Sequence, residues 1–244
     1  MEKNNTGDIK ISGSGSAGGG KYNEVSISGS GKINGDIECV DFKTSGSSKV
    51  IGDLKASTIK ISGSTRIEGN VEVEEMKVSG SAHVTGQIKC QSIKINGSTH
   101  VGGNLCAEEV TIAGCAHIEK NCEAECFKAS GSFKIQGLLN AGEVNIRIGG
   151  NCNVQEIGGE HIEIRVSPLD NSFIRKVIDK MFNSKGMLTT ALIEGDEIYL
   201  QNTNAKIVRG NTITIGEGCN IGLVEYSGEI IISSDSIVGE QKKV

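Results

Sequence analysis

The chain repeats itself every 17 residues, and this period constrains its fold more than any other feature of the sequence. We call the set of positions that share one place in successive repeats a column. One column holds only glycine, and another holds only isoleucine and valine. The first is Gly29, Gly46, Gly63, Gly80, Gly97, Gly114 and Gly131, and the second is Ile33, Val50, Ile67, Val84, Val101, Ile118 and Ile135. A unit this short cannot enclose a core by itself, so successive units must stack on one another.

Apolar and polar residues alternate within each repeat, as in Lys60-Ile61-Ser62, which is the pattern of a half-buried β-strand. Stacking places equivalent strands about 4.8 Å apart, so each strand pairs with those of the neighbouring units. The sequence therefore predicts an all-β protein, a parallel β-helix (solenoid) with about 17 residues per turn. We expect the Ile33 column to be buried and Lys60, Lys77 and Lys94 to be exposed. We expect the glycine column at corners, where a positive φ favours glycine.

The period is interrupted once, which divides the chain into three parts. A β-helix is predicted for residues 1–166, a helical insert for 167–187, and further β-helix turns for 188–244, where strands resume at Ile198, Ile213 and Ile230. The insert has one apolar helical face, formed by Phe173, Ile174, Val177, Ile178, Met181 and Phe182. We expect this face to dock on the solenoid or to cover one of its ends. Basic residues around it leave peripheral contact with a membrane as the alternative.

Composition narrows the classes of partner and the compartment. The net charge of -5 disfavours nucleic acid as the main partner. No apolar run approaches the ~20 residues of a membrane span, and the first residues lack the apolar core of a signal peptide. Eight cysteines in such a chain indicate a reducing compartment and free thiols. We therefore expect a cytoplasmic protein.

Three histidines, His83, His100 and His117, are also spaced 17 residues apart. Imidazoles one turn apart could share a metal ion, which makes these residues a candidate metal site. The same column continues, however, as Lys32, Lys49 and Arg66 in the preceding repeats. This continuation favours an outward basic column in which histidine is one variant, and we expect no bound metal.

Two other clusters have the residue types of a functional site. Cys106, Cys115, Cys122 and Cys126 are close in sequence, but they fall in four different columns, so their thiols do not converge on one ion. Asp36 and Asp53 lie one turn apart, which is the carboxylate spacing of a retaining glycosidase. Their column continues as the amides Asn70, Gln87, Asn104 and Asn121, which favours a column of hydrogen-bonding side chains beside a turn. We expect no catalytic residue and no cofactor, and a carbohydrate-active enzyme is the least favoured reading.

The repeat and the C-terminal sequence resemble the bactofilins, the polymer-forming cytoskeletal proteins of bacteria. The resemblance is carried by the recurring Ile-x-Gly-Ser and Ile-x-Gly-x-Ile segments over nearly the whole chain. More specifically, the strings Ile193–Leu200, Val208–Gly210, Ile215–Cys219 and Val224–Tyr226 are similar to a longer, Firmicute-type branch of the family. The resemblance implies a right-handed β-helix that assembles head to tail without nucleotide and serves as a non-enzymatic scaffold for envelope-associated machinery. Typical bactofilins have one compact β-helix between proline-rich tails, whereas this chain is longer and carries the insert.

The ends of a β-helix give a physical reason to expect assembly. Each end is a turn of unpaired backbone groups, which must be capped or stacked. The candidate assembly residues are Ile9 and Ile11 near the first residue and Ile230, Ile232 and Ile237 near the last. Head-to-tail contact is heterologous and therefore propagates as a filament. We expect a homopolymer, with envelope-associated proteins as further partners and a membrane-proximal location. The alternative is a discrete binding module that acts through its charged outer columns.

Overall fold

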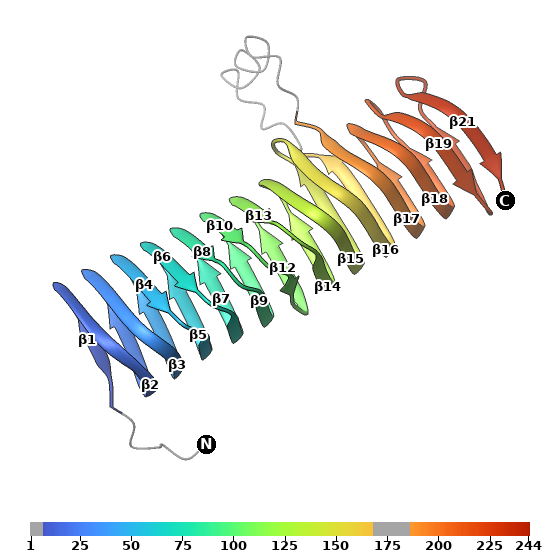
Figure 1. Ribbon diagram of the computed structural model, residues 1–244. Coiled ribbons are helices and arrows are strands. Elements are labelled where there is room, and N and C mark those ends of the chain that lie inside the picture. The colour runs from blue at the N-terminus through green and yellow to red at the C-terminus, as the bar shows by residue number, and fades with distance from the viewer. Residues whose placement is uncertain (1–6, 168–185) are drawn as a thin grey trace, which may run out of the picture. The chain divides into compact units, whose positions relative to one another are not determined.

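The computed structural model describes residues 7–167 and 186–244. The chain divides into two compact units, Met1–Ala124 and Glu125–Val244, which we call the N-terminal and C-terminal units. In each unit, short parallel strands follow one another in successive turns (Figure 1). This confirms the predicted all-β solenoid. The described residues contain no helix, and the predicted apolar face from Phe173 to Phe182 lies outside them.

The N-terminal unit is built from short strands, and β14 leads from it into the C-terminal unit. The strands are β1 (Ile9–Ile11), β2 (Ser14–Ile27), β3 (Ser30–Thr44), β4 (Ser47–Ile51), β5 (Leu54–Ile61), β6 (Ser64–Glu68), β7 (Val71–Val78), β8 (Ser81–Val84), β9 (Ile88–Ile95), β10 (Ser98–Val101), β11 (Leu105–Cys106), β12 (Glu109–Ile112), β13 (Cys115–Ile118) and β14 (Cys122–Ala129).

The C-terminal unit has longer strands, several of which run round a corner of the solenoid. They are β15 (Ser132–Ile148), β16 (Cys152–Val166), β17 (Leu188–Leu200), β18 (Thr203–Ile215), β19 (Asn220–Tyr226), β20 (Ile230–Ile232) and β21 (Ile237–Lys243). The strands β16 and β17 pair directly, with Ile162 opposite Ile198, although residues 167–187 separate them in sequence.

Strand pairing follows the period in the N-terminal unit and departs from it in the C-terminal unit. Lys60 lies opposite Lys77, and Ile67 lies opposite Val84, 17 positions on in both cases. In the C-terminal unit the interval changes from turn to turn. It is 18 between Val144 and Ile162, 15 between Ile198 and Ile213, and 17 between Ile213 and Ile230. The turns therefore stay in register while the corners absorb the differences in length.

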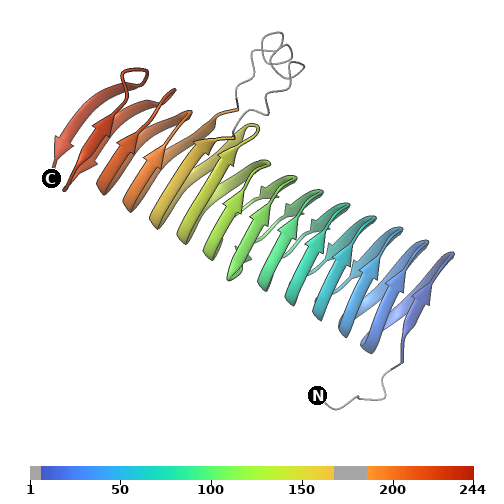
Figure 2. The ribbon, with the colours of Figure 1, turned by 180° about the vertical axis from the view of Figure 1, so that it is seen from behind.

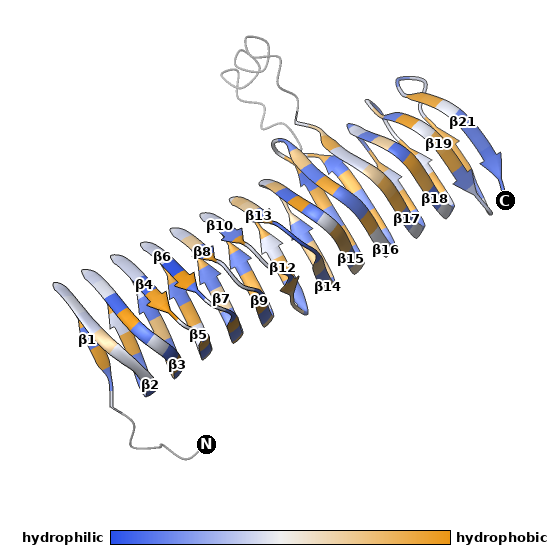
Figure 3. Cartoon of the chain, viewed as in Figure 1, coloured by the Kyte–Doolittle hydropathy of each residue, from blue (hydrophilic) through white to orange (hydrophobic). Residues whose placement is uncertain are grey.

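The core lies inside the turns and is formed by the predicted column. Ile33, Val50, Ile67, Val84, Val101, Ile118 and Ile135 are each at most 1% exposed. Lys60, Lys77 and Lys94 are exposed, as expected. Figure 3 shows the result as short alternating bands of apolar and polar residues along the strands. The predicted register of the repeat is confirmed.

The glycine column has a different cause from the one predicted. Among the described residues, the glycines with a positive φ are Gly20, Gly35, Gly52 and Gly218, and none belongs to the Gly29 column. A Cβ atom on Gly63 would lie 2.0 Å from the carbonyl oxygen of Gly46, and one on Gly46 would lie 2.0 Å from that of Gly29. Glycine is needed here because successive turns bring their backbones into contact, which leaves no room for a side chain.

Candidate functional surfaces: the two terminal edges and the outer columns

The first turn of the N-terminal unit leaves one edge open. The strand β1 pairs in parallel with β2, placing Ile9 opposite Val25 and Ile11 opposite Ile27. Val25 and Ile27 are buried, whereas Ile9 and Ile11 are half-buried because no strand of the described chain covers their other side. This edge therefore offers two partly exposed isoleucines and a row of backbone groups that lack strand partners.

The last turn of the C-terminal unit ends in the same way (red in Figures 1 and 2). The strand β20 places Ile230 opposite Ile213 and Ile232 opposite Ile215. Ile213 and Ile215 are buried, while Ile230 and Ile232 are half-buried. Ile237, in the neighbouring strand β21, is 69% exposed. The predicted assembly residues thus lie in the outermost turns of their units.

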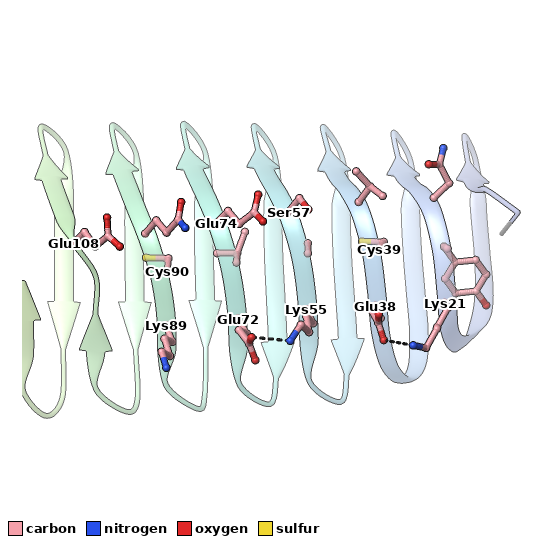
Figure 4. Close-up of a pocket in the computed structure, with 16 residues that line it drawn as sticks. Lys21, Glu38, Cys39, Lys55, Ser57, Glu72, Glu74, Lys89, Cys90 and Glu108 are labelled. Carbon is pink, nitrogen blue, oxygen red and sulfur yellow. Dashed lines mark hydrogen bonds and ion pairs between the residues drawn. The ribbon is translucent and has the colours of Figure 1, made fainter. Parts of the chain in front are cut away.

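A groove of about 940 Å³ runs along the outside of the N-terminal unit (Figure 4). Its floor is a column of small inward residues: Cys39, Ala56, Val73 and Cys90, each 5–9% exposed. Two outward columns form its sides. One alternates in charge and consists of Lys21, Glu38, Lys55, Glu72 and Lys89. The other is Asn23, Val40, Ser57, Glu74, Gln91 and Glu108.

Ion pairs neutralise part of the alternating column. The Nζ atom of Lys21 lies 2.8 Å from a carboxylate oxygen of Glu38, and that of Lys55 lies 2.7 Å from one of Glu72. The hydrogen bond from Lys55 lowers the pKa of the Glu72 carboxyl. These side chains are more than half exposed, so each pair contributes about 0–1 kcal/mol to stability. The column therefore sets a charge pattern more than it stabilises the fold.

The three histidines stack on one another in a single outward column. The ring centroids of His83 and His100 are 4.6 Å apart, and those of His100 and His117 are 4.9 Å apart. Nε2 of His100 lies 3.1 Å from a carboxylate oxygen of Glu119. Lys32, Lys49 and Arg66 precede them in the same column. No set of three potential metal ligands lies close enough to share an ion in the part of the chain that the structure describes.

Burial lowers the pKa of the His83 imidazole, and the positive charges of Arg66 and His100 lower it further. Glu119 and Glu68 act weakly in the opposite direction. The neutral form of His83 is therefore favoured in the folded protein. The column is consequently less charged than an equivalent row of exposed histidines.

The clustered cysteines face different directions. Cys122 is fully buried and Cys115 is exposed, while Cys106 and Cys126 are intermediate. All described cysteines are free thiols. Burial raises the pKa of Cys39 and Cys90 to about 12, and it raises that of Cys122 further. These buried thiols stay protonated at neutral pH, which makes them poor nucleophiles and poor metal ligands.

The Asp36 column holds successive turns together through hydrogen bonds. The amide N–H of Asp53 donates to Oδ1 of Asp36 at 2.8 Å, and the amide N–H of Asn70 donates to Oδ1 of Asp53 at 2.7 Å. The bond repeats from Gln87 to Asn70 and from Asn121 to Asn104. The predicted hydrogen-bonding column is confirmed, and these carboxylates serve the backbone of the next turn.

A second alternating charge column, in the C-terminal unit, was not found from the sequence. Arg209 lies 3.1 Å from Glu194 and 2.8 Å from Glu225, and Lys242 lies 3.6 Å from Glu225. Successive members are 15, 16 and 17 residues apart, so a search at a fixed period misses them. The signal that could have found them is the alternation of sign at intervals close to one turn.

The comparisons with known proteins agree with this geometry. The model of the bactofilin family, described as polymer-forming cytoskeletal, matches residues 2–89. The chain is 55% identical over 237 residues to the uncharacterized protein YhbE of Bacillus subtilis (strain 168), which covers 97% of this chain and 98% of YhbE. It is 39% identical over 92 residues to the uncharacterized protein YhbF of the same bacterium, which covers 38% of this chain and 35% of YhbF. No solved structure gives a significant match. In the described residues, no helix is both long and apolar enough to span a membrane.

Proposed function

Because the chain belongs to the bactofilin family of polymer-forming cytoskeletal proteins, we propose that it assembles end to end into filaments without nucleotide. The observation that carries this proposal is the state of the two terminal turns. Ile9 and Ile11 at one edge, and Ile230 and Ile232 at the other, continue buried apolar columns yet are themselves half-buried. An identical edge from a second molecule supplies the missing neighbour.

Two contributions favour such a junction. Each ladder hydrogen bond formed between the terminal strands contributes about 1 kcal/mol net. Covering the isoleucines contributes roughly 25 cal/mol for each Å² of apolar surface removed from water. Joining Ile230 and Ile232 of one molecule to Ile9 and Ile11 of the next is heterologous, so each addition leaves a new free edge. The product is a filament with one direction.

We further propose that the filament is a non-enzymatic scaffold in the cytoplasm close to the cell envelope, where it positions envelope-associated proteins. The proposal is supported by the structural, cytoskeletal character of the family. The outer charged columns of both units remain on the sides of such a filament, where they are accessible to partners. The insert at 167–187 lies between strands that pair directly, so it projects from the side of the solenoid rather than interrupting it.

Sedimentation and negative-stain microscopy of the purified protein without nucleotide test the filament. Wild-type protein is expected to form filaments. Ile11→Lys and Ile232→Lys place a charge in a terminal edge and are expected to reduce assembly while leaving the β-rich circular dichroism spectrum unchanged. Ser64→Lys, an outward substitution in the middle of the N-terminal unit, is the control. If both end variants polymerise like wild type, the contact does not run through these edges.

The second candidate is a discrete binding module, and the groove beside the alternating charge column favours it. The groove has a small apolar floor with charged sides, which is the composition of a docking surface for another molecule. A module of this kind is expected to stay monomeric at all concentrations in the sedimentation experiment. The same measurement therefore separates the two candidates.

A further inference from the structure

One face of the N-terminal unit carries an acidic column next to a basic column. The face is formed by equivalent short segments of β2, β3, β5, β7, β9 and β12, whose middle residues point into the core. The outward residues on one side of these middle residues are Glu24, Asp41, Thr58, Glu75, Ser92 and Glu109. On the other side they are Ser26, Lys43, Lys60, Lys77, Lys94 and Thr111. The face therefore has four acidic and four basic side chains in two parallel rows.

Most of the basic row is not neutralised within the molecule. Lys43 lies 3.2 Å from Glu24 and 3.3 Å from Asp41. None of the ion pairs in the described part of the chain involves Lys60, Lys77, Lys94 or Glu75, and all four are exposed. Like charges about 4.8 Å apart along the solenoid repel one another. Opposite charges brought from outside reduce that repulsion.

We propose that two copies of the N-terminal unit pair side by side through this face, with their solenoid axes parallel. Two copies can face each other by a two-fold rotation in either of two ways. A rotation about an axis parallel to the solenoid exchanges the rows, so that each acidic row meets the basic row of the other copy. A rotation about an axis parallel to the strands puts acid against acid and lysine against lysine. The charge pattern therefore selects the parallel arrangement.

The same pattern identifies the partner as a second copy of this chain. Because the acidic and basic residues of the face balance, a polyanion gains no net attraction from it, whereas an identical face matches it row for row. In the paired arrangement, Glu75 of one copy faces Lys77 of the other. Lys60 and Lys94 of that copy lie one turn to either side of Lys77.

The size of the face makes pairing depend on filament formation. Six turns at about 4.8 Å and four residues per strand at about 3.3 Å give on the order of 400 Å² per copy. A stable interface needs roughly 800 Å² per partner. Single molecules are therefore not expected to pair, whereas two filaments add one such contact for every subunit. The inference rests on the proposed function in this respect.

Charge reversal tests the arrangement by negative-stain microscopy of filament width at low ionic strength. Wild-type filaments are expected to be paired, and to become single at about 1 M salt, where the Debye length falls to about 3 Å. Glu75→Lys and Lys77→Glu are each expected to give single filaments. The double variant E75K/K77E restores opposite charges across the face and is expected to restore pairing. Glu74→Lys makes the same change in charge at the neighbouring exposed position, on the groove side, and is expected to leave filaments paired.

Three outcomes overturn the inference. Wild-type filaments that stay single at low ionic strength leave end-to-end assembly intact but contradict the pairing. A gain in pairing with Glu75→Lys alone shows that acidic rows face each other, which contradicts the parallel arrangement. If no filament forms at all, the proposed function fails, and the pairing fails with it because one face is too small to hold two molecules together.

Discussion

The hydroxyl of Ser48 donates a hydrogen bond to the hydroxyl of Thr65, one turn away, across 2.9 Å inside the buried core. The two residues belong to an inward column in which Thr99 lies two turns beyond Thr65. Thr99 is 2% exposed, and its hydroxyl has no hydrogen-bond partner. The same chemical group is thus satisfied at one turn and unsatisfied at another.

This contrast predicts opposite effects of the same substitution. Thr99→Val removes an unpaired buried hydroxyl and is expected to raise the free energy of unfolding by about 1 kcal/mol. Thr65→Val leaves the hydroxyl of Ser48 without its acceptor and is expected to lower it by about 1–2 kcal/mol. Urea denaturation of the two variants beside wild type measures both changes. A loss of stability in Thr99→Val contradicts the assignment of an unpaired hydroxyl.

A charge in the core column is expected to unfold the N-terminal unit. Val84 is fully buried, so Val84→Asp places an unpaired carboxylate in the core at a cost of several kcal/mol. Lys77→Ala, on the exposed side of a neighbouring strand, is expected to change stability by less than about 0.5 kcal/mol. Circular dichroism and thermal melting of both variants make the comparison. Similar melting temperatures for the two variants would falsify the register.

The glycine column is expected to be intolerant of even one methyl group. Gly63→Ala places its Cβ 2.0 Å from the carbonyl oxygen of Gly46, and backbone cannot move aside as a flexible side chain can. We expect strong destabilisation or loss of soluble protein. Gly18→Ala is the control, because nothing lies within 4 Å of a Cβ at that position. Alanine there is expected to be neutral or to stabilise by about 0.5 kcal/mol through the unfolded state.

Stability is expected to decrease on acidification through His83. Its pKa in the folded protein is lowered, mainly by burial and then by Arg66 and His100, whereas the unfolded chain takes up a proton at pH about 6.5. The contribution of His83 is therefore fully present above pH about 6.5 and is lost as the pH falls from there through the folded pKa. Urea midpoints at pH 7.5 and 5.5 measure the difference. His83→Gln is expected to reduce it, and His161→Gln, at an exposed position of the C-terminal unit, is the control.

Thiol reactivity is expected to divide the cysteines into fast and slow classes. Cys115 is exposed and is expected to react quickly with a disulfide reagent at pH 8. Cys39 and Cys90, whose pKa values burial raises to about 12, are expected to react only when the protein unfolds. Cys115→Ser therefore removes part of the fast phase, whereas Cys90→Ser does not. A fast phase that is insensitive to Cys115→Ser contradicts the predicted orientation of that column.

The sequence predicts the solenoid because the repeat reports directly on the core. Every turn must present a branched apolar residue at the Ile33 column, and this requirement appears as a period. The cause of the glycine column could not be predicted, because contact between the backbones of Gly46 and Gly63 depends on how closely the corners stack. The pairing of Arg209 with Glu194 and Glu225 was hidden by corners of unequal length. The bond between Ser48 and Thr65 was also hidden, because their column mixes serine, threonine and alanine.

The hydrogen bonds of the Asp36 column all run in one direction along the chain. The side chain of Asp36 accepts from the backbone of Asp53, which comes later in the sequence, and Asp53 does the same for Asn70. A turn that has already formed therefore holds an acceptor ready for the turn that follows, and needs nothing from it in return. Domains fold from the N-terminus during synthesis. On the ribosome, each finished turn can serve as the template for the next segment to emerge, so the solenoid can grow at the rate of translation without waiting for its C-terminus.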